Sequence, residues 1–332
     1  MKQMILPQVP FPRRSKLIIG ISGGVDSMAL LKLLYDYYPQ PKERMIVAHV
    51  NYGLRGRDSQ KDESLVRETC EKLGLPCRIL RVKSFKARVG REKRSLQDLA
   101  REIRYSFFAK IAHREKAWGV AVAHHQEDQA ETVLDRLLRG AGARGLSGLR
   151  PIQTLWFPGQ SKPLRVWRPL LSYEKNTFRT YLKESSFFWR EDRSNGEDGY
   201  RRNRIRNRLL PYLTKWNPRI RGVLARVGEI ISEEDRLLES MVAPMGPKIQ
   251  AKWVKGKFQA LSVPFGKFPL ALKRRFVREV AEKLNPNARG LSFERIEEVI
   301  RVWEGKERGP RDIGFGLSAN QKGGRILMFL SR

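Results

Sequence analysis

Residues suited to phosphate binding gather in one short segment near the start of the chain. Residues 22–27 read Ser-Gly-Gly-Val-Asp-Ser and lie between an apolar run and an amphipathic stretch. In a turn from strand to helix, backbone N–H groups and the positive helix end converge, and glycines let an anion approach closely. Asp26 repels an anion unless a cation joins it, so we interpret Asp26 as a Mg²⁺ ligand. The predicted nucleotide-binding residues here are Ser22, Gly23, Gly24, Val25, Asp26 and Ser27.

A second segment, His-His-Gln-Glu-Asp-Gln-Ala-Glu-Thr over residues 124–132, carries two carboxylates three residues apart. On a helix, Asp128 and Glu131 share one face. This pair could hold Mg²⁺, accept the charged amine of a substrate, or act as a base toward an amine nucleophile. Acids at a helix N-terminus also favour the helix dipole, but that does not account for the paired histidines. A zinc site at His124, His125 and Asp128 is disfavoured because no cysteine or glutamate pattern completes it.

Polar residues also follow a second apolar run, which ends near His49 and Asn51. Asp58 and Asp62 come shortly afterwards. If the apolar runs are parallel strands, their carboxyl ends meet at the sheet edge where ligands bind. A single histidine is often only a packed side chain, but this position favours a nucleoside contact for His49.

Five arginines occur within the eight residues that follow Tyr200. This density is high for a routine solvated face, and the planar guanidinium group binds phosphate through two hydrogen bonds. Some of these arginines could reach a nucleotide while others follow a nucleic-acid backbone, and the sequence does not divide them. The residues that we assign to nucleic acid are Arg201, Arg204, Arg206 and Arg208.

The charge balance indicates a large polyanionic partner. Lys and Arg number 66 against 35 Asp and Glu, which gives a formal net charge of +31. Nucleic acid is favoured over an anionic membrane surface, because phosphate neutralisation supplies most non-specific nucleic-acid affinity. No run approaches the roughly 20 apolar residues of a membrane span, and prolines interrupt residues 1–18. We therefore expect a cytoplasmic protein with no membrane association and no signal peptide, and we predict no protein partner.

The elements that position these residues alternate between strand and helix. Short apolar runs predict strands at 16–21, 45–50, 77–82, 118–123 and 164–167. Amphipathic stretches predict helices at 26–37, 60–73, 95–115, 126–139 and 172–184. We expect residues 141–163 to form a loop. The alternation predicts an α/β fold with a doubly wound, mainly parallel sheet.

A chain of 332 residues exceeds the roughly 250 that one core usually serves, so we predict two domains. The polar break at 216–218 places the boundary after residue 215. The domain at 1–215 would carry the chemistry, and the smaller domain at 216–332 would be mainly helical. The helices expected in the second domain cover 219–241, 269–284 and 292–304, with a hairpin near the end.

Several strings together resemble the tRNA(Ile)-lysidine synthetases of the PP-loop superfamily, which are N-type ATP pyrophosphatases with an adenine nucleotide alpha hydrolase-like fold. The resemblance extends over about residues 16–213. The strings are SGGVDS (22–27), HVNYGLR (49–55), SLQDLAREIRY (95–105), HHQEDQAET (124–132), RGAGARGLSGL (139–149), EDRSN (191–195) and RRNRIRNRLLP (201–211).

The resemblance implies a reaction and its ligands. Members of that family adenylate C2 of the wobble cytidine in the anticodon, and the ε-amine of free L-lysine then displaces AMP. ATP, Mg²⁺, L-lysine and an isoleucine tRNA with a CAU anticodon are the implied ligands. By analogy and from its basic charge, the small C-terminal domain would contact the acceptor arm or the tRNA body.

The resemblance also assigns site residues. Catalytic roles fall on Asp26, Asp128, Glu131 and Arg202, and the two acids of the second segment are also assigned to lysine or metal. ATP contacts extend to His49, Asn51, Arg101 and Arg104, and Asn203 and Arg206 match further site positions. Two departures occur: Tyr52 stands where the family usually has histidine, and Gln97 where it usually has glutamate. The second departure removes one carboxylate contact.

Two other functions stay open. A PP-loop tRNA thiolase would need cysteines for sulfur transfer or for a metal cluster. Cys70 and Cys77 are the only two cysteines, and they are too far apart for a CxxC pair. A non-enzymatic basic RNA-binding module is disfavoured because the acids of both segments are intact.

Overall fold

The computed structural model describes residues 4–9, 12, 14–92, 95–157, 162–191, 201–243, 251–254, 257–264, 268–285, 288, 290–322 and 325–330. Tyr200 and residues 192–195 of the EDRSN string lie outside this set. Two compact units make up the chain, Met1–Ser232 and Glu233–Arg332. The division falls within helix α11 (Ile220–Val242), whereas the sequence places the boundary after residue 215. Among the described residues, no helix is both long and apolar enough to cross a bilayer.

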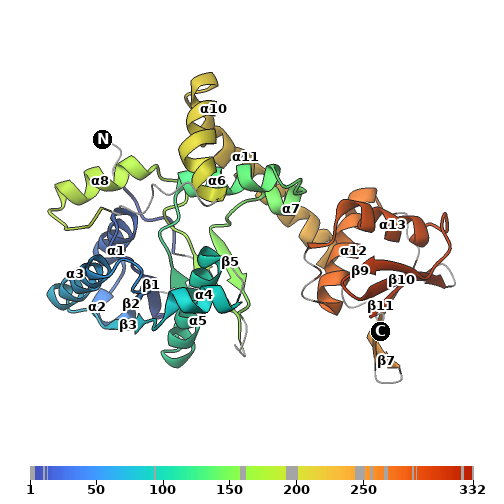
Figure 1. The fold of residues 1–332 in the computed structure, drawn as a ribbon, viewed down its shortest axis with the longest axis horizontal. Coiled ribbons are helices and arrows are strands. Elements are labelled where there is room, and N and C mark those ends of the chain that lie inside the picture. Colours follow the sequence, from blue (N-terminus) through green and yellow to red (C-terminus); the bar gives the residue numbers. More distant parts are fainter. Residues whose placement is uncertain are drawn as a thin grey trace. The chain divides into compact units, whose positions relative to one another are not determined.

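The N-terminal unit is built on a six-stranded sheet with the strand order β3-β2-β1-β4-β6-β5 (Figure 1). All neighbouring strands are parallel except β5 and β6. This confirms the predicted doubly wound, mainly parallel sheet. The strands are β1 (Leu17–Gly20), β2 (Met45–Asn51), β3 (Cys77–Arg81), β4 (Val120–Ala121), β5 (Ile152–Leu155) and β6 (Leu164–Trp167).

Helices cover both faces of this sheet, because successive side chains of a buried strand point to opposite faces. Leu17 and Ile19 of β1 pack in one core with α1 and α8, whereas Ile18 packs in a second core with α5. The helices before the arginine-rich segment are α1 (Val25–Tyr37), α2 (Pro41–Arg44), α3 (Arg57–Leu73), α4 (Phe85–Glu92), α5 (Leu96–Arg114), α6 (Gln126–Leu137), α7 (Ala143–Leu146) and α8 (Lys175–Glu184).

The loop predicted for residues 141–163 is wrong in part, because α7 and β5 lie within it. α7 is a single turn, and β5 has four residues with a polar centre, so neither gives a clear hydrophobic period. Arg136 of α6 donates through Nη1 to the carbonyl oxygens of Gly145 and Gly148, at 2.7 and 2.8 Å. The glycine-rich RGAGARGLSGL string therefore folds back onto α6 and supports it.

The arginine-rich segment is helical from Arg201 to Trp216, and we call it the arginine helix. It consists of α9 (Arg201–Arg204), a π-helical turn η2 (Ile205–Leu209) and α10 (Leu210–Trp216). Pro211 accounts for the wider turn: it has no N–H to donate, and its ring clashes with the carbonyl four residues earlier in a regular α-helix. Wider turns of this kind are frequent at functional sites.

The C-terminal unit packs two helices against a five-stranded sheet, of which the sequence predicts only the final hairpin. The helices are α12 (Leu270–Leu284) and α13 (Phe293–Trp303). The antiparallel sheet has the order β7-β8-β11-β10-β9, with bounds Ala251–Val254, Lys257–Pro264, Arg325–Leu330, Leu317–Lys322 and Arg311–Gly314. Trp303 lies buried in its core beside Phe276, with ring centroids 5.6 Å apart.

Candidate nucleotide site and acid pair

The 22–27 segment forms the turn between β1 and α1 that the sequence predicts. Gly23 has a φ of +93°, a region that side chains with a Cβ rarely adopt. Ser27 braces the turn: its Oγ accepts from the Ser22 N–H at 3.1 Å and donates to the Gly24 carbonyl at 2.9 Å. Gly24 is the N-cap of α1, and no described side chain caps it. The backbone N–H groups of the first turn are therefore available to an anion.

Asp26 on α1 lies near charged groups from two other segments of the chain. Its Oδ2 lies 3.6 Å from Nε2 of His125, which precedes α6, and 3.8 Å from Nζ of Lys175 at the start of α8. Its Oδ1 is buried and has no hydrogen-bond partner among the described residues. An unpartnered buried carboxylate oxygen costs free energy, so this atom is suited to a cation or a donor brought by a ligand.

His125 connects these charged groups to Asp128 and Glu131, which we call the acid pair. Burial lowers its pKa, but Asp26, Glu127 and Asp128 outweigh burial and raise the pKa to about 10. Nδ1 lies 2.8 Å from Glu127, and Nε2 lies 3.4 Å from Asp128 Oδ2. His125 is therefore a cation at neutral pH, with acidic groups on both sides.

Two arginines of the arginine helix form ion pairs with the acid pair. Glu131 is 2% exposed and accepts from Arg202 Nε at 2.8 Å and from Arg206 Nη2 at 2.9 Å. Asp128 accepts from Arg202 Nη2 at 2.8 Å. Burial raises the Asp128 pKa, but His125, His124 and the two arginines outweigh it and hold the pKa well below its usual range. Asp128 is therefore a poor proton acceptor in this arrangement.

Arg202 and Arg206 thus lie on the acid pair, although the sequence assigns Arg206 to nucleic acid. The other assigned arginines, Arg201, Arg204 and Arg208, are exposed on a different face of the arginine helix. Arg201 pairs through Nε with Asp135 on α6, at 2.7 Å.

His49 and Asn51 lie at the carboxyl end of β2 beside this turn. His49 is buried, its Nδ1 donates to the Ile21 carbonyl at 2.9 Å, and burial lowers its pKa. It therefore supports the residue just before the turn. Asn51 donates to Glu63 on α3 at 2.9 Å and accepts from the Gly53 N–H.

Arg101 and Arg104 lie on α5, with their guanidinium carbons 4.8 and 5.4 Å from the ring centre of Tyr105. Burial lowers the His124 pKa; Asp128 opposes this effect, and the positive charges of Arg168, Arg104 and Arg101 add to it. Of the two departures from the family pattern, Tyr52 donates to the Ala100 carbonyl at 2.7 Å, whereas Gln97 is exposed.

The contact of Glu63 with Asn51, at the end of β2, can be tested through its dependence on pH. The hydrogen bond from Arg81 lowers its pKa to about 2 despite burial, with Asn51 and Arg67 adding to the effect. Because the folded pKa is depressed, the stabilisation is present above pH 4.5 and is lost as the pH falls toward 2. Arg81 is largely exposed, so we expect Glu63→Gln to lower the free energy of unfolding by only about 1–2 kcal/mol at neutral pH.

Denaturant unfolding of both proteins at several pH values measures this difference. It should shrink between pH 4.5 and 2, and a difference that is constant with pH contradicts the assignment. Glu68→Gln, an exposed carboxylate on the same helix, should change little at any pH.

Comparison with known proteins places this geometry in a family. A model of the PP-loop domain matches residues 1–213. The chain belongs to the PP-loop family. The β1–α1 turn of this PP-loop protein is the feature that the sequence predicts for ATP binding.

The curated relatives of this PP-loop protein include several tRNA(Ile)-lysidine synthases, which confirms the resemblance seen in the sequence. One from Geobacter sulfurreducens is 32% identical over 287 residues, which cover 86% of this chain and 59% of that protein. One from Clostridium acetobutylicum is 35% identical and covers 69% of this chain and 48% of that protein. The chain thus spans about half to three-fifths of the length of these relatives.

A solved structure shares the PP-loop fold. The U34-tRNA thiolase from Methanococcus maripaludis, solved with its iron–sulfur cluster, has a TM-score of 0.55 at 19% identity. The match covers 69% of this chain and 76% of that chain. At this identity the similarity supports the fold alone.

Sequence reasoning missed a second set of contacts at the PP-loop. The Arg190 N–H donates to the Gly23 carbonyl at 3.0 Å, and its guanidinium group bonds Asp62 and Asp58 at 2.7 and 3.0 Å. Asp62 also accepts from Arg55 at 2.7 Å. The position of Arg190 next to the EDRSN string was the available signal. No feature of the sequence indicates that Lys175 approaches Asp26.

Proposed function

We propose that this protein ligates L-lysine to C2 of the wobble cytidine in a tRNA(Ile) with a CAU anticodon, using ATP and giving lysidine. The cytidine would first be activated as an adenylate with pyrophosphate as the leaving group, and the lysine ε-amine would then displace AMP. The observation that carries the proposal is the approach of Asp26 on the PP-loop to Asp128 through His125. The lysidine synthase relatives support this choice of substrates. With a tRNA as substrate, the reaction would take place in the cytoplasm.

The PP-loop and its neighbours would bind ATP. Backbone N–H groups at the start of α1 suit the departing phosphates. Mg²⁺, when bound, would neutralise charge on the pyrophosphate leaving group, and the unpartnered Oδ1 of Asp26 fits it, since Mg²⁺ often takes one or two carboxylates plus phosphates. The cationic His125 and Lys175 would hold that carboxylate in place. His49 and Asn51 would support the loop and the β2 end beside it.

The acid pair would have divided roles. Glu131 would be a positioning residue, because its carboxylate is taken up by Arg202 and Arg206, and those arginines would face the charge that develops on phosphate. Asp128 would attract the lysine ammonium group, since its low pKa keeps it charged. Its low basicity disfavours a general-base role, so the amine proton would leave to another acceptor or to water.

The exposed arginines would bind the tRNA backbone. Arg201, Arg204 and Arg208 face away from the acid pair, and phosphate contacts of this kind supply affinity without sequence preference. The C-terminal unit, with α12, α13 and its sheet, would bind another part of the tRNA body.

Labelled lysine tests the proposal directly. The purified protein is incubated with ATP, Mg²⁺, labelled lysine and individual tRNA transcripts, and the label is located by nuclease digestion. We expect label at the wobble cytidine of the CAU isoleucine tRNA, with one AMP and one pyrophosphate released per lysine. No release of AMP and pyrophosphate with any transcript would falsify the proposal.

A tRNA thiolase is the enzyme alternative, because a thiolase shares the fold. Cys70 is buried near the end of α3, and Cys77 begins β3. We expect the double change Cys70→Ser and Cys77→Ser to leave lysine-dependent AMP release within about twofold of wild type, since neither thiol takes part in the proposed chemistry. Loss of AMP release in a variant with unchanged circular dichroism favours sulfur chemistry instead.

A basic RNA-binding module without activity is the other alternative. It predicts tRNA binding without turnover of ATP, so the same AMP assay separates it from a ligase.

A further inference from the structure

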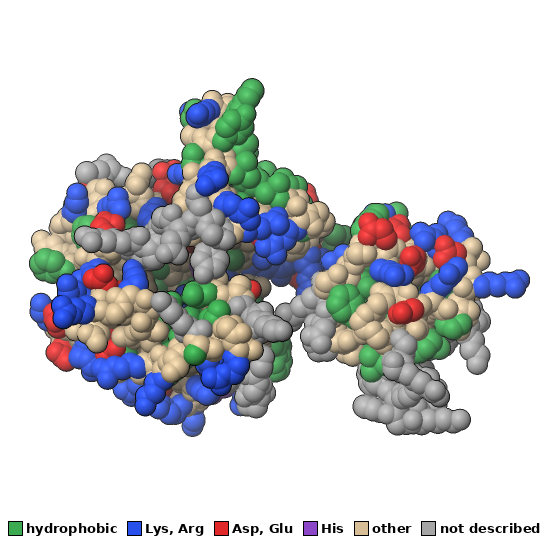
Figure 2. All heavy atoms as spheres, viewed as in Figure 1, with side chains coloured by type: hydrophobic (Ala, Val, Ile, Leu, Met, Phe, Trp, Pro, Cys, Tyr) green, Lys and Arg blue, Asp and Glu red, His purple; other side chains and the backbone are tan. Residues whose placement is uncertain are grey.

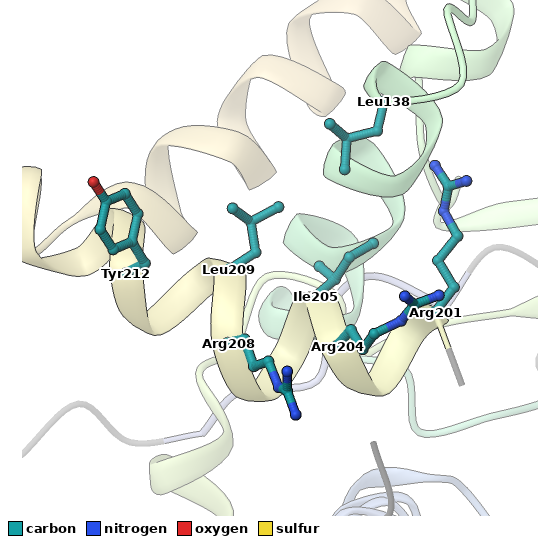
Figure 3. A pocket seen from close by; sticks show the side chains of 7 residues that line it. All are labelled: Leu138, Arg201, Arg204, Ile205, Arg208, Leu209 and Tyr212. Atoms are coloured by element: carbon teal, nitrogen blue, oxygen red, sulfur yellow. The ribbon is translucent and has the colours of Figure 1, made fainter. Parts of the chain in front are cut away.

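A groove lies between the end of α6 and the arginine helix, and the proposed chemistry does not use it. Its volume is about 610 Å³, within the range of sites for small organic ligands. Figure 3 shows Leu209 and Ile205 of the arginine helix directed toward Leu138, which directly follows α6, with Tyr212 at one end and Arg201 at the other. Arg204 and Arg208 also line it. The floor is apolar, and part of the border is cationic.

The apolar residues of the groove are exposed to an unusual degree. Tyr212 is 55% exposed and Leu138 is 55% exposed, and Trp216, one turn beyond Tyr212, is 78% exposed. Figure 2 shows hydrophobic and basic side chains together on and beside the projecting helix α10. A contiguous exposed apolar surface bordered by charge marks a binding site more often than isolated apolar residues do.

The arginine helix carries cations and aromatic rings beside the same groove. Arg204 and Arg208 precede Tyr212 and Trp216 along this helix, and the first three of these residues line the groove. Proteins that bind single-stranded nucleic acid combine a cationic track for phosphates with aromatic rings on which bases stack. A paired helix hides its base faces within its own stack, so such a surface suits unpaired nucleotides.

We propose that this groove binds an unpaired nucleotide of RNA, with its base stacked on Tyr212 over the floor formed by Leu138 and Leu209. Arg204 and Arg208 contact the phosphates on either side of that base, and Trp216 stacks on a neighbouring base. The proposal rests on the proposed tRNA function for the identity of the RNA, and it adds that an unpaired segment is read by stacking. The net charge of +31 and the arginine border favour RNA over a second copy of this basic chain.

The acid pair and the groove share the same two helices. α6 carries Asp128 and Glu131 near its beginning and is followed by Leu138, while the arginine helix bonds the acids through Arg202 and Arg206. Ile205 is buried against Leu134 and Leu210 between the two helices. A nucleotide in the groove is thus held by the same elements that hold the acid pair.

Binding measurements test this inference without ATP or lysine, so the result does not depend on ligation activity. The probes are a stem-loop RNA with an unpaired loop and a fully paired RNA duplex of the same length. Stacking on an aromatic ring contributes roughly 1–3 kcal/mol per base. We expect Tyr212→Ala to weaken stem-loop binding about tenfold, with little change for the duplex and the same dependence on salt. Tyr212→Phe should retain wild-type affinity because the ring is kept.

Two further variants are controls. Tyr37→Ala removes an exposed tyrosine at the end of α1 and should leave both affinities unchanged. Arg204→Ala should weaken both RNAs and reduce the salt dependence, because a phosphate contact is lost.

Three outcomes would overturn the inference. They are a Tyr212→Ala variant with unchanged stem-loop affinity, a Tyr212→Phe variant as weak as Tyr212→Ala, and an equal loss for stem-loop and duplex. A fourth overturning outcome is measured by sedimentation of each variant. If Tyr212→Ala converts a dimer to a monomer and leaves the RNA affinity unchanged, the groove is an interface between two copies of the chain. Because Tyr212 is exposed, these variants are expected to fold, and thermal unfolding checks this.

Discussion

Asp26→Asn is expected to reduce pyrophosphate release at least about 100-fold and to leave tRNA affinity within about twofold of wild type. The asparagine keeps the size of the side chain but removes the charge that faces His125 and Lys175. It also converts the carboxylate, whose buried Oδ1 without a described partner we assign to Mg²⁺, into a neutral amide, which is a weaker ligand for that ion. Phosphate contacts from the backbone of the PP-loop and from the arginine helix are unchanged, so binding should persist while turnover fails.

The metal assignment can be measured separately from the loss of rate. Residual turnover of Asp26→Asn should require a higher Mg²⁺ concentration for half-maximal rate. An unchanged Mg²⁺ dependence contradicts the metal role and leaves the cationic cluster as the reason for the loss. Asp36→Asn is the matched control: Asp36 lies on the same helix but bonds Lys32 and Tyr181 at the surface, so its turnover should stay near wild type.

The parts of this site that the sequence predicts are those that depend on local order. The turn at 22–27 follows from glycines placed between an apolar run and an amphipathic stretch. The shared face of Asp128 and Glu131 follows from their spacing on a helix. The strand and helix alternation also predicts the sheet, because buried parallel strands are nearly continuous apolar runs.

The parts that the sequence does not predict depend on contacts between distant segments. Nothing in the segment around Lys175 indicates that its ammonium group approaches Asp26. The position of Arg190 next to the EDRSN string marks it as a site residue but does not indicate that it bonds Asp62. β5 was missed because it is an edge strand of four residues, which pairs with β6 alone among the described strands, and four residues carry little hydrophobic pattern.

The sequence also does not predict which arginines bond the acid pair and which line the groove. Their density predicts phosphate binding for the whole segment, but it does not indicate which of these side chains meet the acid pair. Arg202 and Arg206 meet the acid pair, while Arg204 and Arg208 line the groove. These two sets of contacts depend on the fold and cannot be told apart from the sequence.

The second large effect is expected for Glu131→Gln, a change in the acid pair that should lower both the stability and the activity of the protein. The carboxylate of Glu131 is almost fully buried and is shared by two guanidinium groups. Glutamine has nearly the same shape but no charge, and its amide nitrogen is a donor that faces two donors. Removing one partner of a buried ion pair costs roughly 3–5 kcal/mol, and because the arginines are about one-third exposed we expect about 2–3 kcal/mol here.

Activity should fall by about 100-fold or more, because Arg202 and Arg206 lose the group that fixes their positions toward phosphate. Asp135→Asn is the matched control on the same helix one turn later, where Asp135 pairs with the exposed Arg201, and it should cost under about 1 kcal/mol and little activity. Glu131→Asp distinguishes position from charge: it keeps the charge but withdraws it by one methylene, so stability should recover more than turnover does. If Glu131→Gln retains wild-type turnover in a folded protein, the arginines do not need this carboxylate, and its role is confined to the packing of α6 against the arginine helix.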